Sequence, residues 1–262
     1  MTVAEALSSS GIDPREARLL LAAASGLPES ALVAFPEKKI SGEAQKQYLA
    51  FVARRAGGEP IAYILGRKEF YGLELAVNAA VLIPRPETEL LVDLALARRP
   101  GSVLDLGTGS GAIALALKRH LPSARVVGAD ASAEALALAR QNAAKFGLDI
   151  EWRLGRWFEP LAGERFEGIV CNPPYVAVGD PHLAALPFEP RLALLAGGDG
   201  LDAVRIVVRE APAYLLPGGW LLLEHGEGQQ EAVRELLEAA GLETHAGWPD
   251  LAGIPRVAGG RR

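Results

Sequence analysis

The stretch Ser102-Val103-Leu104-Asp105-Leu106-Gly107-Thr108-Gly109-Ser110-Gly111-Ala112 decides the fold of this chain. Its first five residues form a short apolar run that predicts a buried strand, and a helical pattern opens at Ala112 and continues over 112–118. The glycines between them let the backbone turn tightly and let a ligand approach the helix N-terminus. This unit of strand, glycine loop and helix predicts a cofactor site on a parallel sheet.

The same alternation continues downstream. Further strands are predicted over 125–129, 150–153, 168–171, 219–224 and 242–245, with helices over 133–146 and 231–240. Strands that alternate with helices of about 10–15 residues indicate βαβ units. We therefore predict an α/β fold with a doubly wound, mainly parallel sheet.

The N-terminal region differs in pattern. Residues 1–65 read as helical: Asp13-Pro14 and Ser41 are helix-start signals, and Gly26 and Gly57-Gly58 are stop signals. Alternating apolar residues around Gly72 predict a β-hairpin. We predict a helical domain over 1–65, a hairpin linker over 66–83 and a cofactor-binding domain over 84–262.

Composition narrows the class of protein. The 262 residues are 50% hydrophobic and 23% charged, which excludes a disordered chain. One cysteine excludes an internal disulfide and a cysteine-rich metal site, and the four scattered histidines show no ligand spacing, so no metal is expected. The chain has no apolar run long enough for a membrane span and no basic leader, so we expect a cytoplasmic protein. The net charge of −5 argues against direct nucleic-acid binding.

The glycine loop alone leaves two cofactors open. Gly107-x-Gly109-x-x-Ala112, with Asp130 about 20 residues further on, also satisfies the dinucleotide fingerprint. Asp105 favours S-adenosylmethionine, because its carboxylate would repel a pyrophosphate but suits an ammonium group. Asp130 ends the second strand, where it can accept hydrogen bonds from ribose hydroxyls of either cofactor.

A second motif, Asn172-Pro173-Pro174-Tyr175, follows the strand predicted over 168–171. The prolines hold φ at about −65° and lack N–H donors, so the Pro173 carbonyl is free beside the Asn172 side-chain oxygen. Two such acceptors suit an NH₂ group, whose delocalised lone pair becomes nucleophilic when the nitrogen is made pyramidal. Tyr175 could pack flat on the planar group that carries that nitrogen.

With these motifs the chain resembles the class I S-adenosylmethionine-dependent N-methyltransferases, and within them the HemK/PrmC family. That family methylates N5 of a glutamine in the Gly-Gly-Gln motif of peptide-chain release factors. The resemblance covers nearly the whole chain and also rests on the segments 59–66, 70–73, 82–89 and 197–202. The most specific of them is Ile83-Pro84-Arg85-Pro86-Glu87-Thr88-Glu89. The chain departs from the family pattern at Glu224-His225-Gly226 and at 253–256, both away from the methyl-transfer motifs.

The resemblance implies a seven-stranded Rossmann-like sheet, S-adenosylmethionine as cofactor with S-adenosylhomocysteine as product, and a release factor as partner in translation termination. It implies cofactor contacts at Gly107, Thr108, Gly109, Ser110, Gly111, Asp130, Trp157 and Asn172. The substrate glutamine would be held by Asn172, Pro173, Pro174 and Tyr175, of which Asn172, Pro173 and Tyr175 would serve the catalytic step. The helical domain would recognise the substrate, and we expect a monomer.

Other functions remain as alternatives. An adenine-N6 methyltransferase acting on DNA or RNA would also need to hold a planar NH₂ group. A nicotinamide-dependent oxidoreductase would leave the Asn-Pro-Pro-Tyr motif unexplained, and a cofactor-binding module without activity is a further possibility.

Several single residues can also be interpreted as purely structural. Trp157 could be an aromatic core residue, and Cys171 is expected to be a buried strand residue. Glu224 and His225 are adjacent, so strand geometry points them to opposite faces and argues against an acid–base pair. Arg85 and Glu87 could be charges at a helix entry or could order the cofactor pocket.

Overall fold

The computed structural model describes residues 1–245 and 247–262. The chain divides into two compact units, Met1–Arg67 and Lys68–Arg262. No helix in these two ranges is long and apolar enough to cross a membrane.

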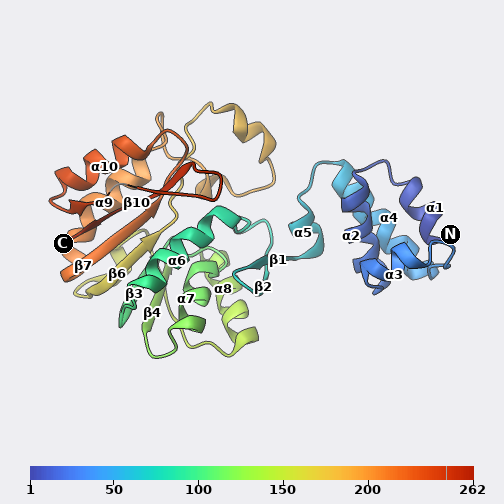
Figure 1. Ribbon diagram of the computed structural model, residues 1–262, viewed down its shortest axis with the longest axis horizontal. Helices are drawn as coiled ribbons and strands as arrows, with labels where there is room; N and C mark the ends of the chain where they lie inside the picture. The colour runs from blue at the N-terminus through green and yellow to red at the C-terminus, as the bar shows by residue number, and fades with distance from the viewer. Residues whose placement is uncertain (246) are drawn as a thin grey trace. The chain divides into compact units, whose positions relative to one another are not determined.

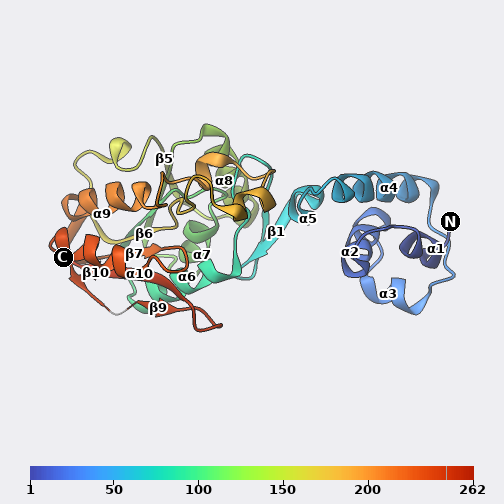
Figure 2. The ribbon, with the colours of Figure 1, turned by 90° about the horizontal axis from the view of Figure 1, so that it is seen from above.

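The first unit is helical, as the capping signals predict. Its helices are α1 (Val3–Ser8), α2 (Pro14–Ser25), α3 (Glu29–Ala34), α4 (Gly42–Ala56) and α5 (Ile61–Leu65). The Asp13 side chain accepts from the N–H groups of the first turn of α2, and Gly26 ends that helix at a φ of 69°. The Ser41 side chain caps α4 in the same way. The helices α1 to α4 gather around a core that includes Leu20, Leu21 and Tyr48 (Figure 2).

A two-stranded hairpin, β1 (Arg67–Phe70) and β2 (Leu73–Ala76), follows, and the predicted Gly72 lies at its turn. Alternate residues of the hairpin point inward. Phe70, Leu73 and Leu75 are completely or almost completely buried and join the core of the second unit.

The second unit is built on a mainly parallel sheet. Its strands are β3 (Ser102–Leu106), β4 (Arg125–Asp130), β5 (Glu151–Leu154), β6 (Phe166–Cys171), β7 (Leu215–Glu224), β8 (Glu243–Thr244), β9 (Trp248–Pro249) and β10 (Pro255–Arg261). Seven run side by side in the order β5-β4-β3-β6-β7-β10-β8, and β9 pairs with β10. Within the described residues this sheet thus has eight strands rather than the predicted seven, because the chain between β8 and β10 makes one more short pairing.

Strands β3 to β7 pair in parallel, and β10 runs antiparallel to β7. The helices are α6 (Glu89–Ala97), α7 (Ala112–His120), α8 (Ala133–Phe146), α9 (Asp202–Tyr214) and α10 (Gln230–Ala239), with short 3-10 turns at Pro86–Thr88, Glu159–Leu161, Pro181–Ala185 and Arg191–Ala193.

Helices cover both faces of the sheet (Figure 1). Leu104 and Leu106 of β3 face the layer of α9 and α10, and Val103, which precedes Leu104, faces the layer of α6, α7 and α8. This alternation buries both sides of the parallel strands and confirms the predicted doubly wound fold.

The strand order reverses at β3. Leu106 lies level with Ala129 on β4 and with Cys171 on β6, so the carboxyl ends of the three strands form one edge. Ligands of open α/β sheets bind in the crevice outside such a reversal point. Both predicted motifs leave the sheet there.

Candidate active site

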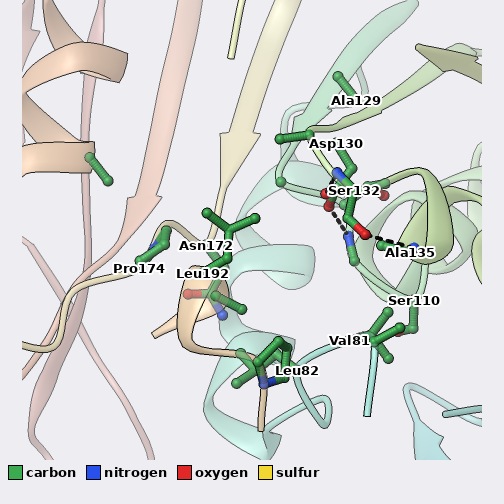
Figure 3. Close-up of a pocket in the computed structure, with 18 of the residues that line it drawn as sticks. Val81, Leu82, Ser110, Ala129, Asp130, Ser132, Ala135, Asn172, Pro174 and Leu192 are labelled. Atoms are coloured by element: carbon green, nitrogen blue, oxygen red, sulfur yellow. Dashed lines mark hydrogen bonds between the residues drawn. The ribbon is translucent and has the colours of Figure 1, made fainter. Parts of the chain in front are cut away.

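A cavity of about 590 Å³ lies at this edge (Figure 3). Its volume is in the range of small-molecule sites. The predicted site residues on its wall are Gly107, Thr108, Gly109, Ser110, Asp130, Trp157, Asn172 and Pro174. The remaining predicted residues, Gly111, Pro173 and Tyr175, lie outside the set that lines it.

The glycine loop adopts backbone conformations that favour glycine. Gly107 and Gly109 have φ values of 73° and 56°, in the left-handed region. The backbone N–H groups of Gly107 and Thr108 both donate to the Ala129 carbonyl, at 2.8 and 3.0 Å. Gly111 also has a positive φ and precedes α7 as its N-cap, where its missing side chain leaves room for Ala139 and Leu115. Its place is therefore structural, behind the loop.

The Asp130 carboxylate lies at the end of β4 and holds two backbone groups. Oδ2 accepts from the N–H of Gly109 at 2.9 Å and Oδ1 from the N–H of Ser132 at 2.8 Å (Figure 3). Each carboxylate oxygen has two lone pairs, so Asp130 retains capacity to accept from a ligand in the cavity.

Asp105 has a different place from the one we inferred. It is completely buried and is not part of the cavity wall. Its Oδ2 accepts from the Thr108 hydroxyl at 2.6 Å and from the N–H of Ala114 at 3.1 Å. Burial raises the pKa of this carboxyl to about 7. Asp105 thus joins the glycine loop to α7, and our argument that it meets an ammonium group is not supported by its position.

The Asn172 side chain is held by one of its two polar groups. Its Nδ2 donates to the Thr88 hydroxyl at 3.1 Å. Its Oδ1 is buried and has no hydrogen-bond partner among the described residues. A buried acceptor left free is costly in a folded protein, so its presence on a cavity wall indicates a position for a ligand donor.

Tyr175 does not line the cavity and is held by hydrogen bonds to other parts of the chain. Its hydroxyl donates to Glu224 Oε1 at 3.3 Å, and its carbonyl accepts from Gln229 Nε2 at 3.1 Å. Gly200 lies against this turn, since a Cβ there would come within 2.3 Å of the Tyr175 carbonyl oxygen. The turn after Asn172 is therefore closely packed.

Trp157 lines the cavity and also packs against the core. It has a φ of 49°, which is unusual for a bulky residue. Its buried Nε1–H has no acceptor within the described ranges.

The structure also shows the surroundings of the other residues singled out in the sequence. Cys171 is buried in β6, where burial raises the pKa of its thiol. The His225 Nδ1 atom pairs with the Gly226 carbonyl at 2.9 Å, while Glu224 bonds to Tyr175. Arg85 lines the cavity and Glu87 is exposed.

Many of the residues that line the cavity were not among the predicted site residues. They include residues 79–82, 192–193 and 195–197, and Asp202 and Ile206. Glu189 joins these regions: its carboxylate accepts from Arg85 at 2.5 Å and from the N–H of Ile83 at 3.1 Å. The signal for these parts was present in the segments 82–89 and 197–202, which carried the family resemblance without assigning them a role.

Comparisons with known proteins match both parts of the chain. Residues 2–66 match the PrmC N-terminal domain, and residues 86–186 match the methyltransferase small domain. The release factor glutamine methyltransferase of Burkholderia pseudomallei is 47% identical, over 99% of this chain and 96% of its own. The one from Xylella fastidiosa (strain Temecula1) is 52% identical, over 85% and 83%. The chain belongs to the release factor glutamine methyltransferase family.

Solved structures show the fold of this family member. A methyltransferase from Pyrococcus furiosus superposes with a TM-score of 0.58 at 19% identity, covering 80% of this chain and 96% of that one. The 16S rRNA N2 G1207 methyltransferase of T. thermophilus gives 0.55 at 24% identity, covering 75% and 49%. The class I methyltransferase fold is thereby confirmed.

Proposed function

We propose that this protein transfers a methyl group from S-adenosylmethionine to the side-chain amide nitrogen of a glutamine in a peptide-chain release factor. The observation that carries the proposal is the free Oδ1 acceptor of Asn172, on a cavity wall in a chain of this family. A glutamine amide offers the NH₂ group that such an acceptor needs.

The cavity fits the cofactor. Its volume, the bent glycine loop, the Asp130 carboxylate and the free indole N–H of Trp157 suit a ligand with ribose hydroxyls and a purine ring. We assign cofactor binding to the loop 107–111, Asp130, Trp157 and Asn172, with Gly111 acting through the loop conformation. When bound, S-adenosylmethionine supplies an electrophilic methyl group on a sulfonium.

The protein's own residues would orient the amide. Asn172 Oδ1 accepts from one N–H of the substrate NH₂ group and the Pro173 carbonyl from the other, which favours a pyramidal nitrogen. Tyr175 anchors this turn through its hydrogen bonds with Glu224 and Gln229, and Pro174 lines the cavity. The nitrogen would gain the methyl group as the bond between the methyl carbon and the cofactor sulfur breaks and S-adenosylhomocysteine is left, and it would release one proton to water, so no side chain is needed as a general base. Orientation of this kind can lower a barrier by about 7–11 kcal/mol.

We assign substrate recognition to residues 1–65, and we propose a cytoplasmic, monomeric enzyme. Val33 and Phe35 are 64% and 54% exposed at the end of α3, which gives this unit apolar surface for a protein partner. The adenine-N6 alternative has no comparable support, because relatives that match 99% of the chain are named for release factors.

The test offers three substrates in parallel. The protein is incubated with methyl-labelled S-adenosylmethionine and a release factor, duplex DNA or RNA. We expect label only in the release factor, and none when the glutamine of its Gly-Gly-Gln motif is replaced by alanine. Label in adenine would support the alternative and overturn the proposal.

A further inference from the structure

The Gln229 side chain joins three loops beside the active-site cavity. They are the turn 172–175 after β6, the loop 197–201 before α9 and the turn 225–229 between β7 and α10. The first carries the proposed acceptors for the substrate amide, and the second leads into α9, whose first turn lines the cavity. Gln229 itself is not part of the cavity wall.

Gln229 uses both ends of its amide. Its Oε1 accepts from the Gly226 backbone N–H at 2.8 Å, and its Nε2 donates to the Tyr175 carbonyl at 3.1 Å. Two longer contacts, at 3.4 and 3.5 Å, join Nε2 to the carbonyls of Asp199 and Gly200. A backbone N–H can only donate and a carbonyl can only accept, so these partners fix which end of the amide faces which loop.

The three loops approach one another at two glycines. A Cβ at Gly200 would lie 2.3 Å from the Tyr175 carbonyl oxygen and 2.7 Å from Gln229 Nε2. A Cβ at Gly226 would lie 3.0 Å from Gln229 Oε1 and 3.3 Å from Tyr175 Cδ2. The missing side chains leave the space that the Gln229 amide occupies, so the junction is built closely around this amide.

A packed helix supports Gln229. Gln229 is the N-cap residue of α10, and its carbonyl accepts from the Val233 N–H at 3.0 Å. Val233 and Leu237 of that helix are completely buried in the core on one face of the sheet. The Gln229 amide therefore ties the turn that follows Asn172 to a fixed element of the fold.

The position of Tyr175 also affects the cavity wall. The next residue is paired with the far side of the cavity: the Val176 N–H donates to the Leu194 carbonyl at 2.9 Å, and the Val176 carbonyl accepts from the Ala196 N–H at 3.0 Å. Ala196 lines the cavity. A shift of the Tyr175 carbonyl would therefore move the acceptors for the substrate relative to the wall of the cavity.

We propose that Gln229 is a positioning residue for methyl transfer, whose amide holds the Tyr175 carbonyl and, with it, the two substrate acceptors of the turn 172–175. Gln229 acts through this turn. Transfer of a methyl group requires alignment of the nitrogen with the cofactor, and a misplacement of about 1 Å can reduce a rate by about 10²-fold. The catalytic consequence rests on the proposed function, but the placement of the turn can be measured without it.

Two substitutions separate the donor of Gln229 from the rest of its side chain. Gln229→Met keeps a side chain of similar length and removes both hydrogen bonds. Gln229→Glu keeps the Oε1 acceptor for Gly226 and removes the donor to Tyr175. At saturating cofactor and release factor, we expect both variants to slow single-turnover methylation by about 10- to 100-fold. Gln230→Met, the same change at the next residue, is the control and should react like the wild type.

The loss should appear in kcat alone. KM for the release factor and Kd for S-adenosylmethionine should not change, and titration calorimetry should still find one cofactor per chain. If Gln229 served only the turn after β7, Gln229→Glu would keep the wild-type rate, because the bond to Gly226 is retained, and the proposal would be overturned. It would also be overturned if the loss of rate matched a loss of bound cofactor, which would show a smaller folded fraction.

The placement of the turn can be followed without catalysis. Asn78, Asn142 and Asn172 are the three asparagines of the chain, so selective ¹⁵N-asparagine labelling gives three side-chain amide signals. We expect the Asn172 signal to shift in both Gln229 variants and to stay in place in Gln230→Met. The other two signals should be unchanged in all three variants.

An Asn172 signal that does not move in either Gln229 variant would refute the positioning role, and so would a wild-type rate in Gln229→Met. A wild type that does not methylate release factors would instead contradict the proposed function. In that case the asparagine signals would still decide whether Gln229 holds the turn.

Discussion

Gly109 and Asp130 are joined by a hydrogen bond of 2.9 Å from the Gly109 backbone N–H to Asp130 Oδ2, although 21 residues separate them. The carboxylate that we assign to the cofactor ribose thus also holds the glycine loop in its bent conformation. Two functions on one side chain make the site sensitive to this position.

Replacing Asp130 should therefore weaken cofactor binding strongly. A charged acceptor contributes about 1.5–3 kcal/mol, so Asp130→Ala should raise the Kd for S-adenosylmethionine by about 10- to 150-fold. Titration calorimetry measures this. Asp149→Ala, an exposed position outside the cavity, serves as the matched control. An unchanged affinity in Asp130→Ala would remove Asp130 from the binding site.

Removing the free acceptor should slow catalysis more than it weakens binding. Asn172→Ala deletes one of the two proposed partners of the substrate NH₂ group, and kcat should fall about 10²–10³-fold, as for other preorganised hydrogen-bond partners. Asn172→Asp should be milder because a carboxylate still accepts. Single-turnover rates at saturating release factor check this, and an alanine variant as fast as wild type would contradict the assignment.

Substitutions on the surface of the helical unit should affect only the reaction with the intact protein substrate. Replacing both Val33 and Phe35 by serine removes exposed apolar surface. Loss of such contacts at an interface should raise KM for an intact release factor by about 10-fold. The rate with a short Gly-Gly-Gln peptide and the cofactor affinity should not change. Leu251→Ser, an exposed apolar position in the second unit, is the control. Equal KM values would argue against recognition through these residues.

Glu189 should matter for stability. Its side chain is almost completely buried and bonds to Arg85 and to the backbone of Ile83. Glu189→Ala leaves both partners unsatisfied, and because Arg85 is partly exposed we expect the free energy of unfolding to fall by about 1–3 kcal/mol. Urea denaturation measures the loss. Removal of the exposed Arg205–Asp199 ion pair should leave stability close to wild type, and a similar loss in both would refute a special role for Glu189.

Glu224 should make stability depend on pH in an unusual direction. Its pKa in the folded protein, about 7, is above the ordinary value of 4.5, so the folded state binds more protons between these two values. Stability should therefore decrease as pH rises from about 4.5 to about 7 and then level off. Relative to Glu224→Gln, the wild type should lose on the order of 1–3 kcal/mol over this range. Denaturation curves at several pH values test this, and parallel pH profiles would contradict it.

The local sequence was enough to predict the elements that depend on interactions between residues close together in the chain. Asp13 and Ser41 cap helices as predicted, and the glycine loop lies between β3 and α7. These features depend on backbone conformation and on hydrogen bonds a few residues apart, which short patterns encode directly. Strand alternation also determined the two-sided sheet and, with it, the edge at which both motifs meet.

Asp105 shows where reading along the chain was insufficient. Its nearness to Gly107 in sequence placed it beside the ligand, but strand alternation turns it to the face opposite Leu104 and Leu106, below α7. The alternation of the strand can be read from the sequence, but the sequence does not show that α7 packs on this face of it.

Only the tertiary structure decided the contacts that orient the site. Asn172 meets Thr88 across 84 residues, Arg85 meets Glu189 across 104, and Tyr175 meets Glu224 across 49. No local pattern specifies such pairs, because they arise when strands from distant parts of the chain align at one edge of the sheet. The sequence determined which residues could do the chemistry, and packing determined which of their atoms are left free to do it.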